Sequence, residues 1–132
     1  MTSKKRVVLI TGAESGIGKS TSKIFLDNGY KVIGTYLKNY NNKNTKDIEY
    51  HRIDITKNKD WENLALYIKK KFKKIDVLVN SAGVRLSGNL ETTSMSDWSY
   101  HLNNNVTGTF LACKYILPFL KKAKNSSIIN LS

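Results

Sequence analysis

Apolar and polar residues alternate along the chain in two patterns, which predict strands and helices in turn. Five short apolar runs predict buried strands, at residues 6–11, 31–36, 48–53, 75–80 and 127–131. Continuous runs such as Val7-Val8-Leu9-Ile10 are typical of strands that are covered on both faces. Their alternation with segments of helical period favours repeated strand–helix–strand units and a mostly parallel sheet.

Apolar residues that recur every three or four positions predict three helices. The first covers residues 16–28, with Ile17, Ile24 and Phe25 facing inward and Asn28-Gly29 as its stop signal. The polar, Asn-rich segment 37–47 that follows the second strand is expected to form a loop with at most a reduced turn or two.

The second helix covers residues 60–71 and carries one apolar stripe formed by Trp61, Leu64, Ile68 and Phe72. The third runs over residues 95–122, with Ser96 as its N-terminal cap. Pro118 is expected to bend this helix or to lie near its end.

Length and composition limit the class of protein. The 132 residues, 40% hydrophobic and 24% charged, are typical of one globular domain over residues 1–132. No apolar run approaches the ~20 residues of a membrane span, and the apolar run after Arg6 is too short for a signal peptide. The lone cysteine, Cys113, excludes an internal disulfide and a multi-thiolate metal site, which favours a small core residue, a cytoplasmic chain and no metal.

The net charge of +12 raises the question of nucleic acid as a partner. The lysines are scattered, except for a cluster in residues 69–74 at the end of the second predicted helix, where the helix dipole favours cations. No zinc-finger spacing or aromatic-rich RNA-binding motif accompanies the charge. Nucleic acid is therefore not an expected partner.

The sharpest motif, Thr11-Gly12-Ala13-Glu14-Ser15-Gly16-Ile17-Gly18, lies where the first strand turns into the first helix. Free backbone N–H groups and the positive end of the helix dipole bind phosphate at such a turn, and glycine lets the ligand approach the backbone closely. The alternative is an ordinary glycine-rich turn.

Three other polar positions follow apolar elements. Asp54 follows the third strand, where it either faces a ligand crevice or starts a turn or helix. The segment Asn80-Ser81-Ala82-Gly83 ends the fourth strand, beside the first strand or as a simple turn. Asn105 lies among apolar residues of the third helix, so its amide needs a partner.

These four motifs, in this order, resemble the short-chain dehydrogenase/reductase family over the whole chain. The resemblance implies an α/β, doubly wound Rossmann-type fold, with a parallel sheet of strand order 3-2-1-4-5 in a three-layer αβα arrangement. It also implies an NAD(P)-dependent oxidoreductase that transfers hydride between the nicotinamide and a ketone or secondary alcohol, with a 3-oxoacyl thioester as one substrate guess. A complete chain is expected to form a homo-oligomer.

The resemblance also implies roles for individual residues. Gly12, Ser15, Ile17 and Gly18, with Gly16 among them, resemble the pyrophosphate and ribose contacts. Asp54 resembles the acid that holds the adenine amine, with Ile55 beside it. Asn80, Ala82 and Gly83 resemble the segment under the adenosine ribose, where the family more often has a second Asn at Ser81. Asn105 resembles the asparagine of the family's proton relay, a role that applies only if the catalytic lysine exists.

The end of the second strand bears on the choice of cofactor. NAD-preferring folds place an acid about 20 residues past the glycines, and here that place holds Tyr36. Thr35, Lys38 and Asn39 are close by, and a lysine there would face a 2′-phosphate. The sequence therefore favours NADP(H) over NAD(H), although Lys38 also fits as an ordinary surface lysine.

The family's catalytic serine, tyrosine and lysine follow the start of the fifth strand, and the sequence reaches only Ser132, which matches the residue before that serine. The string Tyr67-x-x-x-Lys71 lies in the second predicted helix and is interpreted as a coincidence. The chain is thus expected to be the cofactor-binding front part of a longer reductase, truncated after strand five and inactive alone.

The predicted topology leaves one face of strands four and five without a helix, so Val77, Val79, Ile128 or Ile129 would expose apolar surface. The alternative hypothesis is a non-catalytic dinucleotide-binding or interaction module whose partner covers that face.

Overall fold

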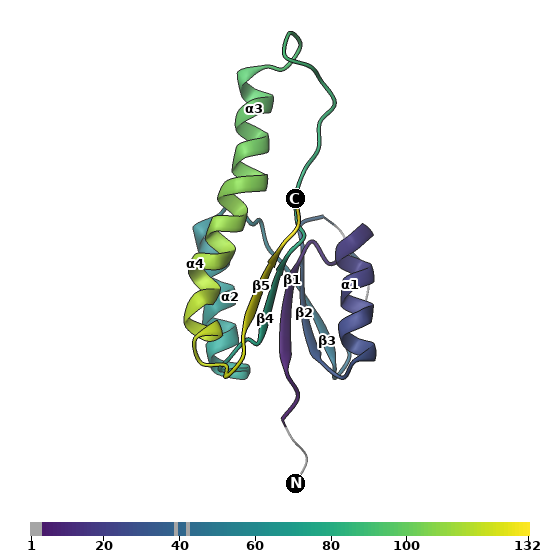
Figure 1. Cartoon of the computed structure of the whole chain (residues 1–132), viewed down its shortest axis with the longest axis vertical. Helices are drawn as coiled ribbons and strands as arrows, with labels where there is room; N and C mark the ends of the chain where they lie inside the picture. The colour runs from purple at the N-terminus through teal and green to yellow at the C-terminus, as the bar shows by residue number, and fades with distance from the viewer. Residues whose placement is uncertain (1–3, 39, 42) are drawn as a thin grey trace.

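A computed structural model describes residues 4–38, 40–41 and 43–132, and it arranges helices on both faces of one sheet (Figure 1). The strands are β1 (Val7–Thr11), β2 (Lys31–Tyr36), β3 (Ile48–Arg52), β4 (Val77–Asn80) and β5 (Ser127–Asn130). All four pairings are parallel, and the strand order is β3-β2-β1-β4-β5. The predicted doubly wound fold and strand order are confirmed.

The helices are α1 (Gly16–Asp27), α2 (Asn58–Lys71), α3 (Met95–Leu102) and α4 (Gly108–Leu120). Helix α1 covers one face of the sheet, and α2 and α4 cover the other (Figure 1). The described residues between 37 and 47 form neither helix nor strand, as expected.

The third predicted helix is divided in the middle by a wider turn. A π-helical segment, η1 (Asn103–Thr107), joins α3 to α4, and Pro118 lies inside the last turn of α4. The cap at its start is Ser94 rather than Ser96, because Ser94 has an extended backbone and its Oγ accepts the N–H of Asp97 at 3.0 Å. The prediction of Ser96 as the cap was wrong.

The core on the α2 and α4 face contains the apolar stripe that was predicted for the second helix. Trp61, Leu64, Ile68 and Phe72 are all buried there against the sheet and α4. Cys113 is half-buried and packs against the same cluster, as a small residue at its border.

The inward face of α1 differs from the prediction. Ile17 and Ile24 are 66% and 61% exposed, so of the three predicted residues Phe25 alone packs against the core on this side, together with its neighbour Leu26. Gly18 and Ser22 are the buried residues of the helix, because these small side chains let α1 lie close to the sheet. The prediction of an inward face was therefore wrong for Ile17 and Ile24 and correct for Phe25.

The exposed sheet surface is smaller than expected. Val77 and Val79 are 5% and 1% exposed, so their predicted exposure was wrong: both pack with Val8 and Ile10 on the α1 face. The apolar surface lies one strand further out, on β5, where Ile128 and Ile129 are 42% and 43% exposed. Among the described residues, none of the helices has the length and apolarity needed to cross a membrane.

Candidate functional site

A cleft of about 710 Å³ opens where the strands end. The strands are parallel and in register, with Thr11 beside Asn80 and Tyr36 beside Arg52, so their carboxyl ends meet at one edge. Ligands of open α/β sheets bind at this edge. The predicted residues that line the cleft are Gly12, Ser15, Gly16, Ile17, Tyr36, Lys38, Ile55, Ala82 and Gly83.

The turn between β1 and α1 forms one wall of the cleft and leaves backbone donors open. Ser15 is the N-terminal cap by position and has extended backbone, but its side chain makes no capping hydrogen bond. The first turn of α1 also contains no acidic residue. The N–H groups of that turn are therefore available to an anion, together with the Ser15 hydroxyl.

Glycine is required in this turn by close backbone contacts. A Cβ at Gly18 would lie 2.0 Å from the carbonyl oxygen of Gly12, and a Cβ at Gly12 would lie 2.8 Å from Cα of Ala82. Gly12 also has a φ of +65°, which disfavours other residues. Gly18 does not line the cleft and instead lets α1 pack onto the turn that does.

The end of β2 forms a second wall. The N–H of Ala13 donates to the carbonyl of Thr35 at 2.9 Å, which ties the glycine-rich turn to this strand. Tyr36 and Lys38 line the cleft. Tyr36 occupies the position at which NAD-preferring folds place an acid that binds the ribose hydroxyls. Asn39, named with them in the sequence prediction, lies outside the described residues.

Asp54 is engaged in a turn and does not line the cleft. Its Oδ1 accepts the N–H of Thr56 at 3.0 Å and the Thr56 hydroxyl at 2.7 Å, and its Oδ2 lies 3.9 Å from Nζ of Lys57. This arrangement fits the turn aspartate left open by the sequence. The neighbouring Ile55 does line the cleft, and its carbonyl accepts the Trp61 indole N–H at 2.8 Å.

The segment after β4 lies under the cleft and is hydrogen-bonded to Thr11 of β1. The Thr11 hydroxyl oxygen accepts the N–H groups of Ser81 at 3.1 Å and Ala82 at 3.0 Å. The Asn80 side chain does not line the cleft: its amide nitrogen donates to Oδ1 of Asn130 at 2.8 Å. Asn80 thus joins β4 to β5, while the residues after it reach the cleft.

Asn105 finds the partner that its amide needs on the loop after β4. Its Oδ1 accepts the N–H of Val84 at 2.8 Å, and its Nδ2 donates to the carbonyl of Val84 at 3.0 Å. One turn earlier, Nε2 of His101 accepts the N–H of Leu86 at 2.9 Å. These side chains fix the loop to the long helix formed by α3, η1 and α4, which projects past the sheet edge (Figure 1).

The cleft also contains residues that the sequence did not single out. Glu14 lines it, and Oε2 of this carboxylate is buried without a hydrogen-bond partner among the described residues. Tyr100 and Asn104 reach it from the long helix. Their spacing of four places them on one helix face, which is the signal that could have found them.

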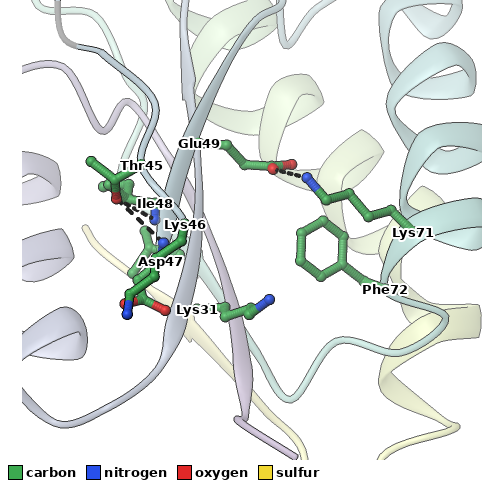
Figure 2. A pocket seen from close by; sticks show the side chains of 9 residues that line it. Lys31, Thr45, Lys46, Asp47, Ile48, Glu49, Lys71 and Phe72 are labelled. Carbon is green, nitrogen blue, oxygen red and sulfur yellow. Dashed lines mark hydrogen bonds and ion pairs between the residues drawn. The ribbon is translucent and has the colours of Figure 1, made fainter.

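A second hollow, of about 20 Å³, lies beside β3 and has room for about one water molecule (Figure 2). Figure 2 shows Lys71 reaching from α2 to the buried Glu49 of β3. His51 also contacts Glu49, at 3.0 Å, and Tyr67 accepts from Lys71 at 3.0 Å. The Tyr67–Lys71 pair therefore belongs to a group of side chains that joins α2 to the sheet, away from the cleft.

Charge in this group is balanced internally. Burial would raise the pKa of Glu49, but hydrogen bonds from Lys71 and His51 hold that pKa below the usual glutamate range. The hydrogen bond to Glu49, followed by that to Tyr67, raises the pKa of Lys71 above the usual lysine range. In the part of the chain that the structure describes, no three His, Cys, Asp or Glu side chains gather as a metal site.

Comparison with known proteins identifies relatives along nearly all of the chain. Residues 6–132 match a family model described as short chain dehydrogenase. A 3-ketodihydrosphingosine reductase of Bacteroides thetaiotaomicron is 33% identical over 127 residues, which cover 96% of this chain and 46% of that protein. The 3-oxoacyl-[acyl-carrier-protein] reductase FabG of Thermotoga maritima is 32% identical over 135 residues, covering 96% of this chain and 55% of the relative.

Solved structures show the same arrangement. The structure of ElxO with NADP bound matches with a TM-score of 0.86 at 33% identity, covering 98% of this chain and 56% of that one. A short chain dehydrogenase from Leptospira borgpetersenii with bound NAD+ matches with a TM-score of 0.87 at 26% identity, covering 96% of this chain and 51% of that one. The chain thus spans about half the length of the relatives it matches.

Proposed function

Because this chain belongs to the short-chain dehydrogenase family, we propose that it carries the nucleotide-binding half of an NAD(P)-dependent oxidoreductase. The reaction of the whole protein is hydride transfer between the nicotinamide and a ketone or secondary alcohol. Two reductases of oxo compounds among the relatives support the substrate class, and FabG supports a 3-oxoacyl thioester in particular.

The observation that carries this proposal is the open N-terminus of α1 against the cleft. Its N–H groups have no side-chain cap, and glycines keep Cβ atoms away from the turn beside them. A diphosphate satisfies those donors and the positive end of the helix dipole together. A cleft of about 710 Å³ also lies within the range of roughly 300–1,000 Å³ of ligand sites.

The residues of the cleft divide between the parts of the dinucleotide. Gly12, Ser15, Gly16 and Ile17 would hold the pyrophosphate and the adjoining ribose, with Gly18 positioning the helix behind them. Tyr36, Lys38 and Ile55 would enclose the adenosine end, and Ala82 and Gly83 would lie under its ribose. The bound nicotinamide supplies the hydride.

Two residues that are predicted to contact the cofactor, Asp54 and Asn80, do not line the cleft. Asp54 would hold the adenine amine through Oδ2, the oxygen that Thr56 does not occupy. Asn80 would have an indirect role: its side chain joins β4 to β5 next to residues 81–83, which would lie under the ribose.

NADP(H) is the favoured cofactor. Tyr36 replaces the acid that would repel a 2′-phosphate, and the exposed Lys38 lines the cleft two residues later. The NADP-bound ElxO structure supports this choice, while the NAD+-bound Leptospira structure keeps NAD(H) open.

Asn105 is the proton-relay residue of the proposal, and its backbone belongs to the π-helical segment beside the cleft. The family's serine, tyrosine and lysine have no counterpart at matching places in the 132 residues. We therefore propose that this chain binds the cofactor without turnover.

Titration of the folded chain with NADPH and NADH, followed by protein fluorescence and by melting temperature, tests the proposal. Saturable binding that raises the melting temperature is expected. An unchanged fluorescence and melting temperature with both nucleotides would overturn it. An assay with a broad panel of alcohols and ketones tests the second part, and turnover would contradict the proposed inactivity.

The exposed strand β5 favours a second candidate, a non-catalytic dinucleotide-binding or interaction module. Ile128 and Ile129 are each more than two-fifths exposed there, which is unusual for adjacent apolar strand residues. Turnover by the chain would also eliminate this candidate.

A further inference from the structure

The positive charge of the chain is concentrated at one end of the sheet. Thirteen of the 22 lysine and arginine residues lie in residues 4–6, 31, 46, 69–74 and 121–124. These positions come just before a strand, at its first residue, or at the last turn of α2. Because the strands are parallel, all of them lie at the end opposite the cleft (Figure 1). Together they form the basic end.

Hydrogen bonds between these segments join them into one surface. Nη2 of Arg6, before β1, donates to the carbonyl of Asn125 in the turn after α4 at 2.9 Å. The N–H of Ile75, before β4, donates to the carbonyl of Phe119 in the last turn of α4 at 3.2 Å. The basic end is therefore held in place by the fold and is continuous from the sheet to the helices.

The acids at this end do not neutralise it. Asp47, Glu49 and Asp76 lie there, and they pair with four of the cations, Lys5, Arg6, Lys71 and Lys74. The other nine cations form no ion pair with a described residue, and all but the half-buried Lys31 are exposed. Thirteen cations against three acids leave a net charge of +10 at the basic end, out of +12 for the chain.

The helix dipole explains only part of this distribution. It favours the cations at the last turn of α2 and after α4. It gives no reason for those in residues 4–6, 31 and 46, because these lie at strand starts, and sheets have only small net dipoles. Arg6 is the one arginine of the basic end, and the rest are lysines. Lysine is a hydrated point charge that suits diffuse attraction better than paired bonds to one phosphate.

We propose that the basic end binds the surface of a bilayer that contains anionic phospholipids, with the cleft facing away from the membrane. This inference goes beyond the proposed function and does not depend on it. Each lysine near such a surface strengthens binding about fivefold, so nine unpaired cations bind without an inserted helix.

A planar lipid surface fits the basic end better than a nucleic acid does. In the described part of the chain, no helix or hairpin projects from this end to enter a groove (Figure 1). The hollow beside β3, at about 20 Å³, is too small for a base to stack inside it. The charges instead spread over the starts of four strands and the turns after two helices.

Co-sedimentation of the 132-residue chain with vesicles tests the proposal, with phosphatidylcholine alone or with about one-third phosphatidylglycerol. The mixed vesicles should bind the chain at about 0.1 M salt and at least about tenfold more weakly at about 1 M salt, because the Debye length shortens. Equal binding to both kinds of vesicle, or binding to neither, would overturn the proposal. Tighter binding to a DNA duplex than to the mixed vesicles, at equal phosphate and salt concentrations, would also overturn it.

A matched pair of variants locates the surface. Lys70→Gln/Lys122→Gln removes two charges from the basic end and should weaken binding to the mixed vesicles about 30-fold. Lys59→Gln/Arg85→Gln removes two exposed charges on the cleft side of the molecule and should weaken it less than about threefold. Equal losses would overturn the proposal. Should melting curves show that the first variant is unfolded, Lys122→Gln alone, with an expected loss of about fivefold, is compared with Arg85→Gln.

Tryptophan emission tests the orientation. Trp98 is 54% exposed on α3, at the far end of the molecule from the basic end, and Trp61 is fully buried (Figure 1). The emission should therefore stay unchanged when the chain binds the mixed vesicles. A blue shift would place the apolar residues around α3 in the bilayer and would overturn binding through the basic end.

Discussion

Gly18 shows how one missing Cβ supports a binding site that the residue itself does not line. Gly18→Ala places a methyl group 2.0 Å from the Gly12 carbonyl oxygen, so α1 must move away from the turn. We expect a loss of measurable NADPH binding and a lower free energy of unfolding, by about 2–3 kcal/mol. Titration calorimetry and urea denaturation measure the two effects.

The matched control for Gly18 is Gly29→Ala, after the other end of α1. Gly29 has a φ of +81° but open space around its Cβ position, so the cost there is backbone strain alone, about 1–2 kcal/mol. Its NADPH affinity should equal that of the wild type. Wild-type NADPH affinity in Gly18→Ala would contradict the packing role of Gly18.

Glu49 makes a pH-dependent contribution to stability. Its pKa is lowered in the folded chain, so its contribution is present above the usual glutamate pKa and is lost as the pH falls through the folded value. Glu49→Gln should reduce the free energy of unfolding by about 1–2 kcal/mol at pH 7. The difference from the wild type should shrink as the pH falls below the usual glutamate pKa and through the lowered value of the folded chain.

Lys71 sets the other boundary of that pH window. Its pKa is raised, so its contribution is present below the usual lysine pKa and is lost only as the pH rises through the folded value. Glu62→Gln, which removes an exposed partner of Lys59, is the control and should cost less than about 0.5 kcal/mol at any pH. A Glu49→Gln difference that stays constant as the pH is lowered from 7 until the Glu49 carboxylate is protonated would contradict the ion-pair explanation.

At the scale of elements, Asn105 joins the long helix to the loop after β4. Asn105→Ala removes both hydrogen bonds to the Val84 backbone, so the amide of Val84 should exchange with solvent at least about tenfold faster. Hydrogen exchange followed by mass spectrometry or NMR measures this rate. Asn103→Ala, an exposed change in the same π-helical segment, should leave the exchange of Val84 unchanged.

Strands were the most predictable elements, because an apolar run buried on both faces leaves few alternatives. Helix faces were less predictable. On α1 the buried positions are Gly18 and Ser22, and small residues give no hydrophobic signal. The π-helical turn around Asn105 also has no signature in the hydrophobic pattern, and its contact with Val84 joins residues that lie 21 positions apart in the sequence.

The site was predictable to the extent that strand ends and the glycine spacing define it. These features placed Gly12, Tyr36, Lys38 and Ala82 at one cleft. Side-chain direction was not predictable, because it depends on partners such as Asn130 for Asn80 and Thr56 for Asp54.

Over the whole molecule, apolar surface collects on β5 and on the outer side of the long helix. Leu102, Val106 and Phe110, each four residues apart, are 41%, 59% and 60% exposed, and Leu131 follows β5 at 43%. Spacings of four align the first three along one helix face. This distribution predicts that the chain binds apolar dyes and associates as its concentration rises.

The double variant Ile128→Ser/Ile129→Ser tests how much of that behaviour comes from β5. Dye fluorescence and association, followed by light scattering, should both fall, because two exposed apolar side chains are removed. The free energy of unfolding should drop by less than about 2 kcal/mol, since much of each side chain is already in water. Leu78→Ala, at the fully buried neighbour of Ile128 in the sheet, should instead cost about 2–5 kcal/mol. If the double variant binds dye and scatters light as strongly as the wild type, β5 is not the apolar surface that drives association.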